Sequence, residues 1–353
     1  MSGTDRLDVL EARTSPLRPR TARTGTSTPR PRTTVAPRRP RRRPVLVSVL
    51  VAVVVVLGGC GSADEATSGG GARNPVAPAG DQVFTIGAIP DQDPEKLQRL
   101  YGTVADYLSE ELGVTVDYEP VTDYAASVSL FRAGDLDMVW FGGLTGVQAR
   151  LQVDGAEAIL QRGIDERFHS VFIANTATGL QPIDDLAGLA QLEGRRFTFG
   201  SESSTSGRLM PEHFLRQAGV SPETDFAGPP GFSGSHDKTI ELVAAGTFEA
   251  GVVNEQVWNS RRDAGEVDPG KVTAIFRTPP YHDYHWVIRP DVAERFGDDF
   301  VDRVKAAFTG LDRSDPTEAE ILELFGADEF IQTDNGNYAE IEEVAGDLGL
   351  IAR

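Results

Sequence analysis

Four hydroxyl side chains stand in a row where a helix is expected to begin, within the segment 200–208 (GSESSTSGR). The segment follows a predicted strand and opens a predicted helix over 207–218. A helix N-terminus presents unpaired backbone N–H groups, and serine and threonine add O–H donors. A capping role needs only one such side chain. The run therefore favours the binding of a tetrahedral anion, with Ser204, Thr205 and Ser206 at its centre.

Two further helix starts carry a side chain that could donate to the same anion. Asp123 is the expected N-cap of a helix that runs to Phe131, and Tyr124 follows it with a phenolic O–H. His236 opens another predicted helix after the Gly/Ser-rich loop 231–235. Spacing alone leaves an alternative for each, because Tyr124 could be a half-buried packing aromatic and His236 a histidine of a capping turn.

The segment 281–286 (YHDYHW) suggests either a metal site or the wall of a cleft. His282 and His285 are three residues apart in a segment that is predicted to be extended, so their side chains should point to opposite faces. We therefore expect no metal here, and we expect Tyr281 and Tyr284 to line a cleft.

A hydrolytic enzyme built on Ser204, His236 and Asp237 is the rival function, and a ligand-sensing domain of a membrane kinase is a third. The glycine spacing in 200–208 matches neither a phosphate-binding Walker motif nor the G-x-S-x-G nucleophile elbow. The only cysteine is Cys60. We predict a binding protein without catalytic residues or a cofactor.

The first 59 residues predict export. They contain 12 Arg and only 3 acidic residues, and the apolar stretch 45–57 is too short for the ~20 residues of a membrane-spanning helix. A basic flank, a short apolar core and small residues are typical of a secretory signal peptide, although a buried strand is the alternative. Leu57–Cys60 (LGGC) resembles a bacterial lipobox. We expect Cys60 to be lipidated and residues 60–82 to form a flexible tether on the extracytoplasmic face of the cell membrane.

The charge of the remaining chain excludes nucleic acid as a partner. Subtracting the first 59 residues from 34 Lys+Arg and 53 Asp+Glu leaves 22 and 50, a net charge of −28. No basic stripe is present to neutralise phosphates. An anionic ligand is still compatible with this charge, because surface charge is screened over about 8 Å and helix N-termini bind anions locally.

Helix and strand patterns alternate from residue 83 onward, which predicts an α/β fold. Pro/Gly-rich breaks near 176–182 and 278–281 suggest that the chain crosses twice between two lobes. We predict one lobe from 83–176 plus 286–353 and the other from 181–280. Such lobes close on a ligand by hinge motion, and we expect a monomer.

Several blocks between residues 83 and 351 resemble the phosphonate/phosphite-type substrate-binding proteins of ABC importers, and most closely the branch named selenate-binding proteins. The matching blocks include 135–149 (DLDMVWFGGLTGVQA), 197–210 (FTFGSESSTSGRLM) and 278–286 (TPPYHDYHW). The resemblance implies a two-lobed periplasmic-binding-protein type II fold with a ligand cleft between the lobes. It also implies a small oxyanion ligand, and an ABC permease with its ATPase as partners.

The resemblance also implies roles for individual residues. In that family the anion is held by an S-T-S segment, a tyrosine at a helix start and a histidine after a Gly/Ser loop. The corresponding residues here are Tyr124, Ser204, Thr205, Ser206 and His236. The expected cleft lining is Phe141, Gly142, Phe168, His169, Asn254, Gln256, Tyr281 and Tyr284.

Three positions depart from members of the family that take amino-phosphonates. Those members have carboxylates where Gln256 and Tyr284 stand, and a tyrosine at the position of Phe168. Without the two acids an ammonium tail would lack a counter-ion. These departures favour a compact inorganic oxyanion over an amino-phosphonate, and the expected ligand is a small tetrahedral oxyanion such as selenate, phosphite or a phosphonate.

The proton on the ligand separates these anions chemically. Selenate and sulfate carry no proton at neutral pH and need only donors, whereas phosphate and monoanionic phosphite carry an O–H that needs an acceptor. Whether Asp237, Glu255 or Asp283 points into the cleft is the observation that decides between them.

Overall fold

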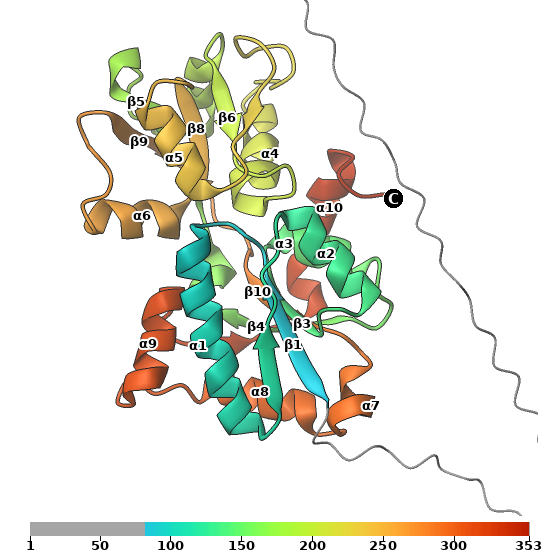
Figure 1. Cartoon of the computed structure of the whole chain (residues 1–353). Coiled ribbons are helices and arrows are strands. Elements are labelled where there is room, and N and C mark those ends of the chain that lie inside the picture. Colours follow the sequence, from blue (N-terminus) through green and yellow to red (C-terminus); the bar gives the residue numbers. More distant parts are fainter. Residues whose placement is uncertain (1–81, 353) are drawn as a thin grey trace, which may run out of the picture. The chain divides into compact units, whose positions relative to one another are not determined.

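Two mixed β-sheets organise residues 82–352, the part of the chain that the computed structural model describes (Figure 1). The six-stranded sheet has the order β11-β4-β10-β3-β1-β2, and the five-stranded sheet the order β7-β6-β8-β5-β9. The strands of the first sheet are β1 (Val83–Ala88), β2 (Thr115–Tyr118), β3 (Met138–Phe141), β4 (Glu157–Arg162), β10 (His285–Ile288) and β11 (Phe330–Gln332). Those of the second are β5 (Ser170–Asn175), β6 (Phe197–Phe199), β7 (Gly231–Phe232), β8 (Ala250–Asn254) and β9 (Val272–Arg277).

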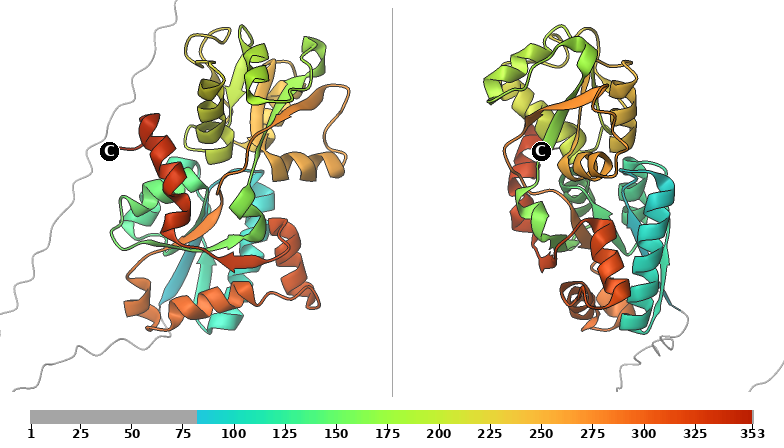
Figure 2. Two further views of the ribbon diagram at one scale, coloured as in Figure 1. Left: turned by 180° about the vertical axis from the view of Figure 1, so that it is seen from behind. Right: turned by 90° about the vertical axis from the view of Figure 1, so that its left-hand side faces the viewer.

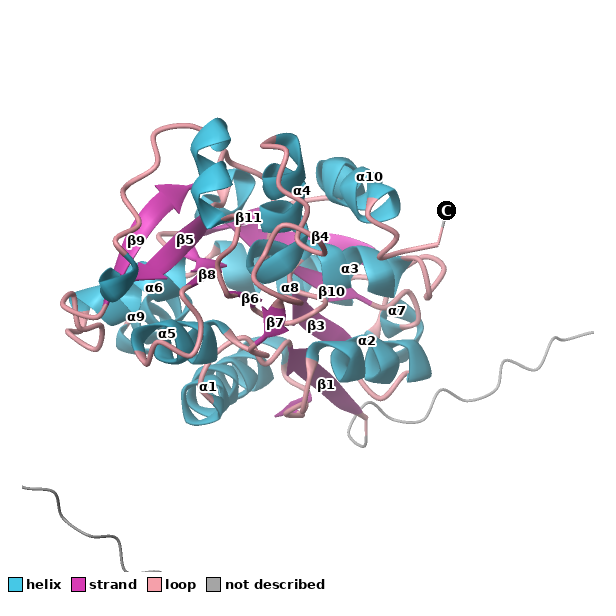
Figure 3. Cartoon of the chain, turned by 90° about the horizontal axis from the view of Figure 1, so that it is seen from above, coloured by secondary structure: helices cyan, strands magenta, loops and turns pink. Residues whose placement is uncertain are grey.

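Helices accompany both sheets (Figures 2 and 3). The helices that accompany the six-stranded sheet are α1 (Pro94–Leu112), α2 (Tyr124–Ala133), α3 (Gly143–Arg150), α7 (Val292–Phe296), α8 (Phe300–Thr309), α9 (Pro316–Phe325) and α10 (Ala339–Asp347). Helix α1 packs against α8 and α9, whereas α3 packs against α2 and α10. With the five-stranded sheet run α4 (Met210–Gln217), α5 (His236–Ala244) and α6 (Glu255–Asp263).

The helix starts that matter for the site are fixed by local side-chain caps. Asp123 accepts a hydrogen bond from the N–H of Ala126 and begins α2, so that Tyr124 becomes its first residue. Ser204 accepts from the N–H of Gly207 at 2.9 Å. This cap begins the π-helical turn η5 (Thr205–Leu209), which continues into α4. The single helix predicted over 207–218 is therefore two joined elements.

The expected boundary between the lobes is wrong at its first crossing. Strand β5 was placed in the first lobe, but it pairs antiparallel with β8 and β9 of the five-stranded sheet. The Pro/Gly-rich segment 176–182 is a turn that follows β5. The chain instead crosses between the sheets over 163–169 and returns over 278–284.

The two crossing segments are hydrogen-bonded to each other. The N–H of Phe168 donates to the Tyr281 carbonyl at 2.8 Å, and the N–H of Tyr281 donates to the Phe168 carbonyl at 3.0 Å. A short 3-10 helix, η2 (Gly163–Arg167), lies at the start of the first crossing. The lobes are thus joined by a paired connection.

The predicted signal peptide at 1–59, the lipidation site Cys60 and nearly all of the predicted tether at 60–82 lie outside the described residues. Within 82–352, no helix is long and apolar enough to cross a membrane.

Candidate functional site

Helix α3 has the N-cap Gly142, which offers no side-chain cap, and two distant residues accept hydrogen bonds from its first N–H groups. The N–H of Gly143 donates to Oδ1 of Asp283 at 3.0 Å, and that of Leu144 donates to Oγ1 of Thr205 at 2.9 Å. A Cβ on Gly142 would lie only 3.1–3.2 Å from these two oxygens, so glycine permits their close approach. Because Thr205 belongs to the second lobe, the helix end is a point where the lobes meet.

Three buried polar atoms around this helix end have no hydrogen-bond partner among the described residues. They are Oη of Tyr124, Oγ of Ser206 and Oδ2 of Asp283. Ser204 lies near the Tyr124 hydroxyl, and Ser206 near Asp283, without forming a hydrogen bond of ordinary geometry. An unpaired buried polar group costs about 1–3 kcal/mol, so three such atoms together indicate a site that binds a polar ligand.

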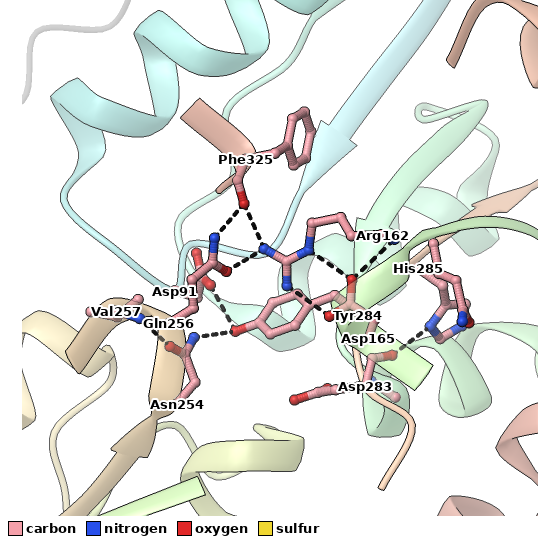
Figure 4. Close-up of polar contacts among 12 residues, drawn as sticks. Asp91, Arg162, Asp165, Asn254, Gln256, Val257, Asp283, Tyr284, His285 and Phe325 are labelled. Carbon is pink, nitrogen blue, oxygen red and sulfur yellow. Dashed lines mark hydrogen bonds and ion pairs between the residues drawn. The ribbon is translucent and has the colours of Figure 1, made fainter. Parts of the chain in front are cut away.

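A second group of polar side chains is centred on the Tyr284 hydroxyl (Figure 4). Oη of Tyr284 donates to Oδ2 of Asp91 at 2.8 Å and accepts from Nδ2 of Asn254 at 2.9 Å. Nε2 of His236 lies 3.3 Å from the same hydroxyl, while its Nδ1 accepts from the backbone N–H of Asn254 at 3.3 Å. This network joins both lobes, because Asp91 belongs to the first lobe, Tyr284 to the returning crossing segment, and His236 and Asn254 to the second lobe.

Burial sets the protonation of these groups. It raises the pKa of Asp91 to about 6 and that of Asp283 to about 7, and it lowers the pKa of His236 to about 3. The pKa values of the Tyr124 and Tyr284 hydroxyls are raised far above neutrality, again mainly by burial. Near neutral pH the site therefore contains neutral donors, and its carboxyl groups titrate in the physiological range.

We expect the raised pKa of Asp283 to contribute a loss of stability as the pH rises from about 4 to about 7, because the folded state keeps a proton on this carboxyl that the unfolded state releases. The buried His236 and His285 contribute in the opposite direction, since their pKa values are lowered to about 3. Urea unfolding at several pH values measures the net slope. Asp283→Asn should make the slope more positive than that of the parent, because the amide does not titrate and the contribution of the histidines remains. A slope identical to that of the parent would contradict the assignment to Asp283.

The structure brings together Tyr124, Thr205, Ser206 and Gly142, and places His236 in the network with Tyr284 and Asn254. Phe168 and Tyr281 lie in the paired crossing segments.

Three residues expected to line the cleft make other contacts. The ring of Phe141 packs against Phe131 inside the first lobe, and Nδ1 of His169 bonds to the Thr278 carbonyl in the crossing. The side-chain amide of Gln256 bonds to Arg162 and to the Phe325 carbonyl of the first lobe.

His282 and His285 do not point to opposite faces as expected. Only His285 lies in β10, and both rings contact the ring of Tyr338. Within the described residues, no group of three or more His, Cys, Asp or Glu side chains could hold a metal ion.

Of the three acidic residues considered for the cleft, only Asp283 belongs to the cluster of unpaired atoms. Asp237 accepts from the N–H of Asp93 and pairs with Arg261. Glu255 pairs with Arg277.

Sequence reasoning missed Asp91 and the buried pair of Arg162 and Asp165. Asp91 follows the carboxyl end of the first strand, where open α/β sheets bind ligands. That position was a usable signal. The residues next to Arg162 in the sequence do not mark it as buried, because the aromatic rings that surround its guanidinium come from distant parts of the chain.

Comparison with known proteins identifies the family. Residues 86–338 match the family model "ABC transporter, phosphonate, periplasmic substrate-binding protein". The chain is 45% identical over 270 residues to the "Probable ABC transporter phosphite binding protein PhnD1" of Prochlorococcus marinus, covering 76% of this chain and 91% of that protein. It is 27% identical to the phosphate-import protein PhnD of Mycolicibacterium smegmatis, over 56% of this chain and 63% of that protein.

A solved structure agrees with this match. The crystal structure of Prochlorococcus marinus PhnD1 in complex with methylphosphonate superposes with a TM-score of 0.75, covering 76% of this chain and 99% of that one. The expected two-lobed periplasmic-binding-protein type II fold is thereby confirmed. The chain belongs to the family of phosphonate-type periplasmic substrate-binding proteins of ABC transporters.

Proposed function

We propose that this protein captures a small phosphorus oxyanion between its lobes and delivers it to an ABC permease with its ATPase. The ligand is phosphite or a phosphonate with a short alkyl group. One observation carries the choice of a phosphorus oxyanion over selenate and sulfate: the unpaired Oδ2 of Asp283 is an acceptor among the donors Tyr124 and Ser206. The family match supports the same class of ligand, as does the relative PhnD1, a probable phosphite-binding protein whose crystal structure contains methylphosphonate.

The role of Asp283 is to share one proton with the bound anion. A phosphite or phosphonate monoanion brings a P–O–H that donates to the carboxylate. Selenate and sulfate bring no proton, so Asp283 must itself be protonated to avoid facing them as an anion. Sites built around a ligand hydroxyl reject analogues that lack it, because a buried polar group is left unpaired. This argument favours phosphite and phosphonates over selenate.

The remaining residues supply donors and shape. Tyr124, Thr205 and Ser206 donate to the anion through their hydroxyls. Ser204 adds a further O–H, since its oxygen already accepts from Gly207. His236 is neutral and holds the Asn254–Tyr284 network, with Nδ1 toward the Asn254 N–H and Nε2 toward the Tyr284 hydroxyl.

Calorimetric titration of the protein with phosphite, methylphosphonate, phosphate, selenate and sulfate at pH 8 tests this proposal. At that pH Asp283 is mostly ionised, because its pKa is about 7. Part of the methylphosphonate still carries its proton at this pH, so we expect it to bind roughly tenfold more tightly than selenate and sulfate, which corresponds to about 1.4 kcal/mol. Phosphite is mainly the dianion at pH 8, and its affinity should lie between those of methylphosphonate and selenate. Equal or tighter binding of selenate would overturn the proposed ligand class. No binding of any of the five anions would overturn the function.

We also propose that the protein is anchored to the extracytoplasmic face of the membrane by a lipid on Cys60. The proposal rests on the basic, apolar and LGGC order of residues 38–60. Cys60→Ser should release the protein from the membrane fraction while leaving anion affinity unchanged, because the site lies far along the chain. A mutant that still fractionates with membranes would rule out the lipid anchor.

A further inference from the structure

The side chain of Gln256 reaches from the second lobe into the first. It begins on α6, where Oε1 accepts from Nη1 of Arg162 and Nε2 donates to the carbonyl of Phe325 (Figure 4). Arg162 ends β4 and Phe325 ends α9, so both partners belong to the first lobe. Both the oxygen and the nitrogen of the Gln256 amide therefore form hydrogen bonds across the boundary between the lobes.

Arg162, which the Gln256 amide contacts in the first lobe, is held in place by other interactions. Arg162 is only 4% exposed, and its Nε and Nη2 donate to the two carboxylate oxygens of Asp165 at 2.7 Å each. Nη1 also donates to the Phe325 carbonyl at 2.7 Å. The rings of Trp140 and Tyr284 hold the guanidinium carbon at 5.4 and 5.1 Å from their centres. The arginine is therefore held in position before the amide of Gln256 reaches it.

The neighbouring backbone is shaped to admit the amide. Gly326 ends α9 in the left-handed conformation, with φ of 59°. A Cβ at this position would overlap the side-chain nitrogen of Gln256. Glycine thus meets two needs at Gly326, the helix-ending conformation and the space for the side chain from the other lobe.

Arg162 also lies at the point where the lobes are joined. It is the last residue before the first crossing segment, and Asp165 within that segment accepts a hydrogen bond from the N–H of Tyr284 in the second. When the lobes separate about these crossings, α6 moves with the second lobe, whereas Arg162 and Phe325 stay with the first. The two bonds of Gln256 can therefore form only when the lobes are closed.

We propose that Gln256 is a closure latch, a positioning residue that holds the lobes together over the bound anion and slows its release without contacting it. This proposal rests on the proposed function, because its effect is measured as the rate at which the bound anion is released. Its effect should be the same for every ligand, because the bonds of Gln256 are made to protein groups. Removing it leaves Arg162 paired with Asp165 and Phe325, so no buried charge is left without a partner.

Gln256→Ala tests the latch, with Asn259→Ala as the matched control on the same helix and the same groove. Stopped-flow kinetics with phosphite and with methylphosphonate should show about tenfold faster release, since one of the lost bonds is charge-assisted. Association should change little, because most such effects appear in the dissociation rate. The control should release both anions at the parental rate, and the melting temperature of Gln256→Ala should stay near that of the parent.

Small-angle scattering of the ligand-free protein gives a readout that does not depend on the ligand. Gln256→Ala should have a larger radius of gyration than the parent and than Asn259→Ala. Unchanged release rates and an unchanged radius would reject the latch while leaving the proposed function intact. Rates that change for one anion and not the other would also reject it, because they indicate direct contact with the ligand. If the parent binds neither anion, the proposed function fails and the scattering comparison alone decides on the latch.

Discussion

Replacing Asp283 by Asn should exchange the anion preference of the site. We expect the affinity for selenate and sulfate at pH 8 to rise by roughly tenfold or more and to lose its dependence on pH. The affinity for methylphosphonate at about pH 6, where it carries a proton, should fall roughly 10- to 150-fold. The fold and the position of α3 should be kept.

The change in anion preference follows from the different surroundings of the two carboxylate oxygens of Asp283. Oδ1 accepts from the N–H of Gly143, and an asparagine must keep its own oxygen there to satisfy that donor. Its Nδ2 then takes the place of Oδ2, the unpaired atom of the parent. The site acquires N–H donors where it had an acceptor, which suits an anion without a proton and opposes a P–O–H group.

The pH dependence of selenate binding supplies the measurement. In the parent, a selenate ion can bind only when Asp283 is protonated, so above the pKa of about 7 its affinity should fall about tenfold for each pH unit. Calorimetry between pH 6 and 9 on the parent and on Asp283→Asn gives both slopes. Parallel slopes would show that the proton is held elsewhere, and Asp91 with its pKa of about 6 would be the next group to replace.

Replacing Ser206 by Ala should weaken the binding of every tetrahedral oxyanion by roughly 10- to 150-fold, because a hydrogen bond to a charged group contributes about 1.5–3 kcal/mol. Ser206 is a sharper test than Thr205, whose Oγ1 already accepts from the N–H of Leu144 and joins the lobes. Oγ of Ser206 is buried near Asp283 and Tyr281 but forms no hydrogen bond of ordinary geometry, so its removal should disturb the ligand-free protein little.

The control for Ser206→Ala is Ser203→Ala, from the same run of hydroxyl residues. Ser203 is half-buried and lies before the N-cap Ser204, outside the unpaired cluster. Calorimetry should show a loss of affinity for Ser206→Ala alone, and thermal unfolding should show similar melting temperatures for both variants. Equal losses in both variants would mean that the helix start as a whole was disturbed and that Ser206 has no special role.

The helix starts were predictable because they depend on neighbours in the sequence. Asp123 and Ser204 each cap a helix within three residues, which brings Tyr124 and Thr205 to the first position of their helices. Helix α3 has no such local cap, because its first N–H groups donate to the distant residues Asp283 and Thr205. What the sequence could not supply was the meeting of these ends, because it depends on how two sheets are joined.

The misplaced strand β5 illustrates this limit. The apolar run 170–174 predicts a strand equally well in either sheet, and only its pairing with β8 and β9 assigns it to the second. The run of proline and glycine near 176–182 is a turn signal, and a turn does not reveal whether a chain leaves its sheet. The partners of a strand depend on residues that are distant in the sequence, so the local pattern cannot predict them.

The buried charges were the least predictable part of the site. Arg162 is stabilised by Asp165 three residues away and by rings from Trp140 and Tyr284 that are distant in sequence. The net charge of −28 after residue 59 gave no hint of a buried arginine at the junction of the lobes. The donors around the proposed anion site act at short range, whereas surface charge is screened.

A crystal structure of the protein with phosphite tests the central claim most directly. The account predicts the phosphorus oxyanion beside the N-terminus of α3, with oxygens within hydrogen-bond distance of Oη of Tyr124, Oγ of Ser206 and Oδ2 of Asp283. An anion bound elsewhere, or one held by donors with Oδ2 of Asp283 turned away from it, would contradict the account.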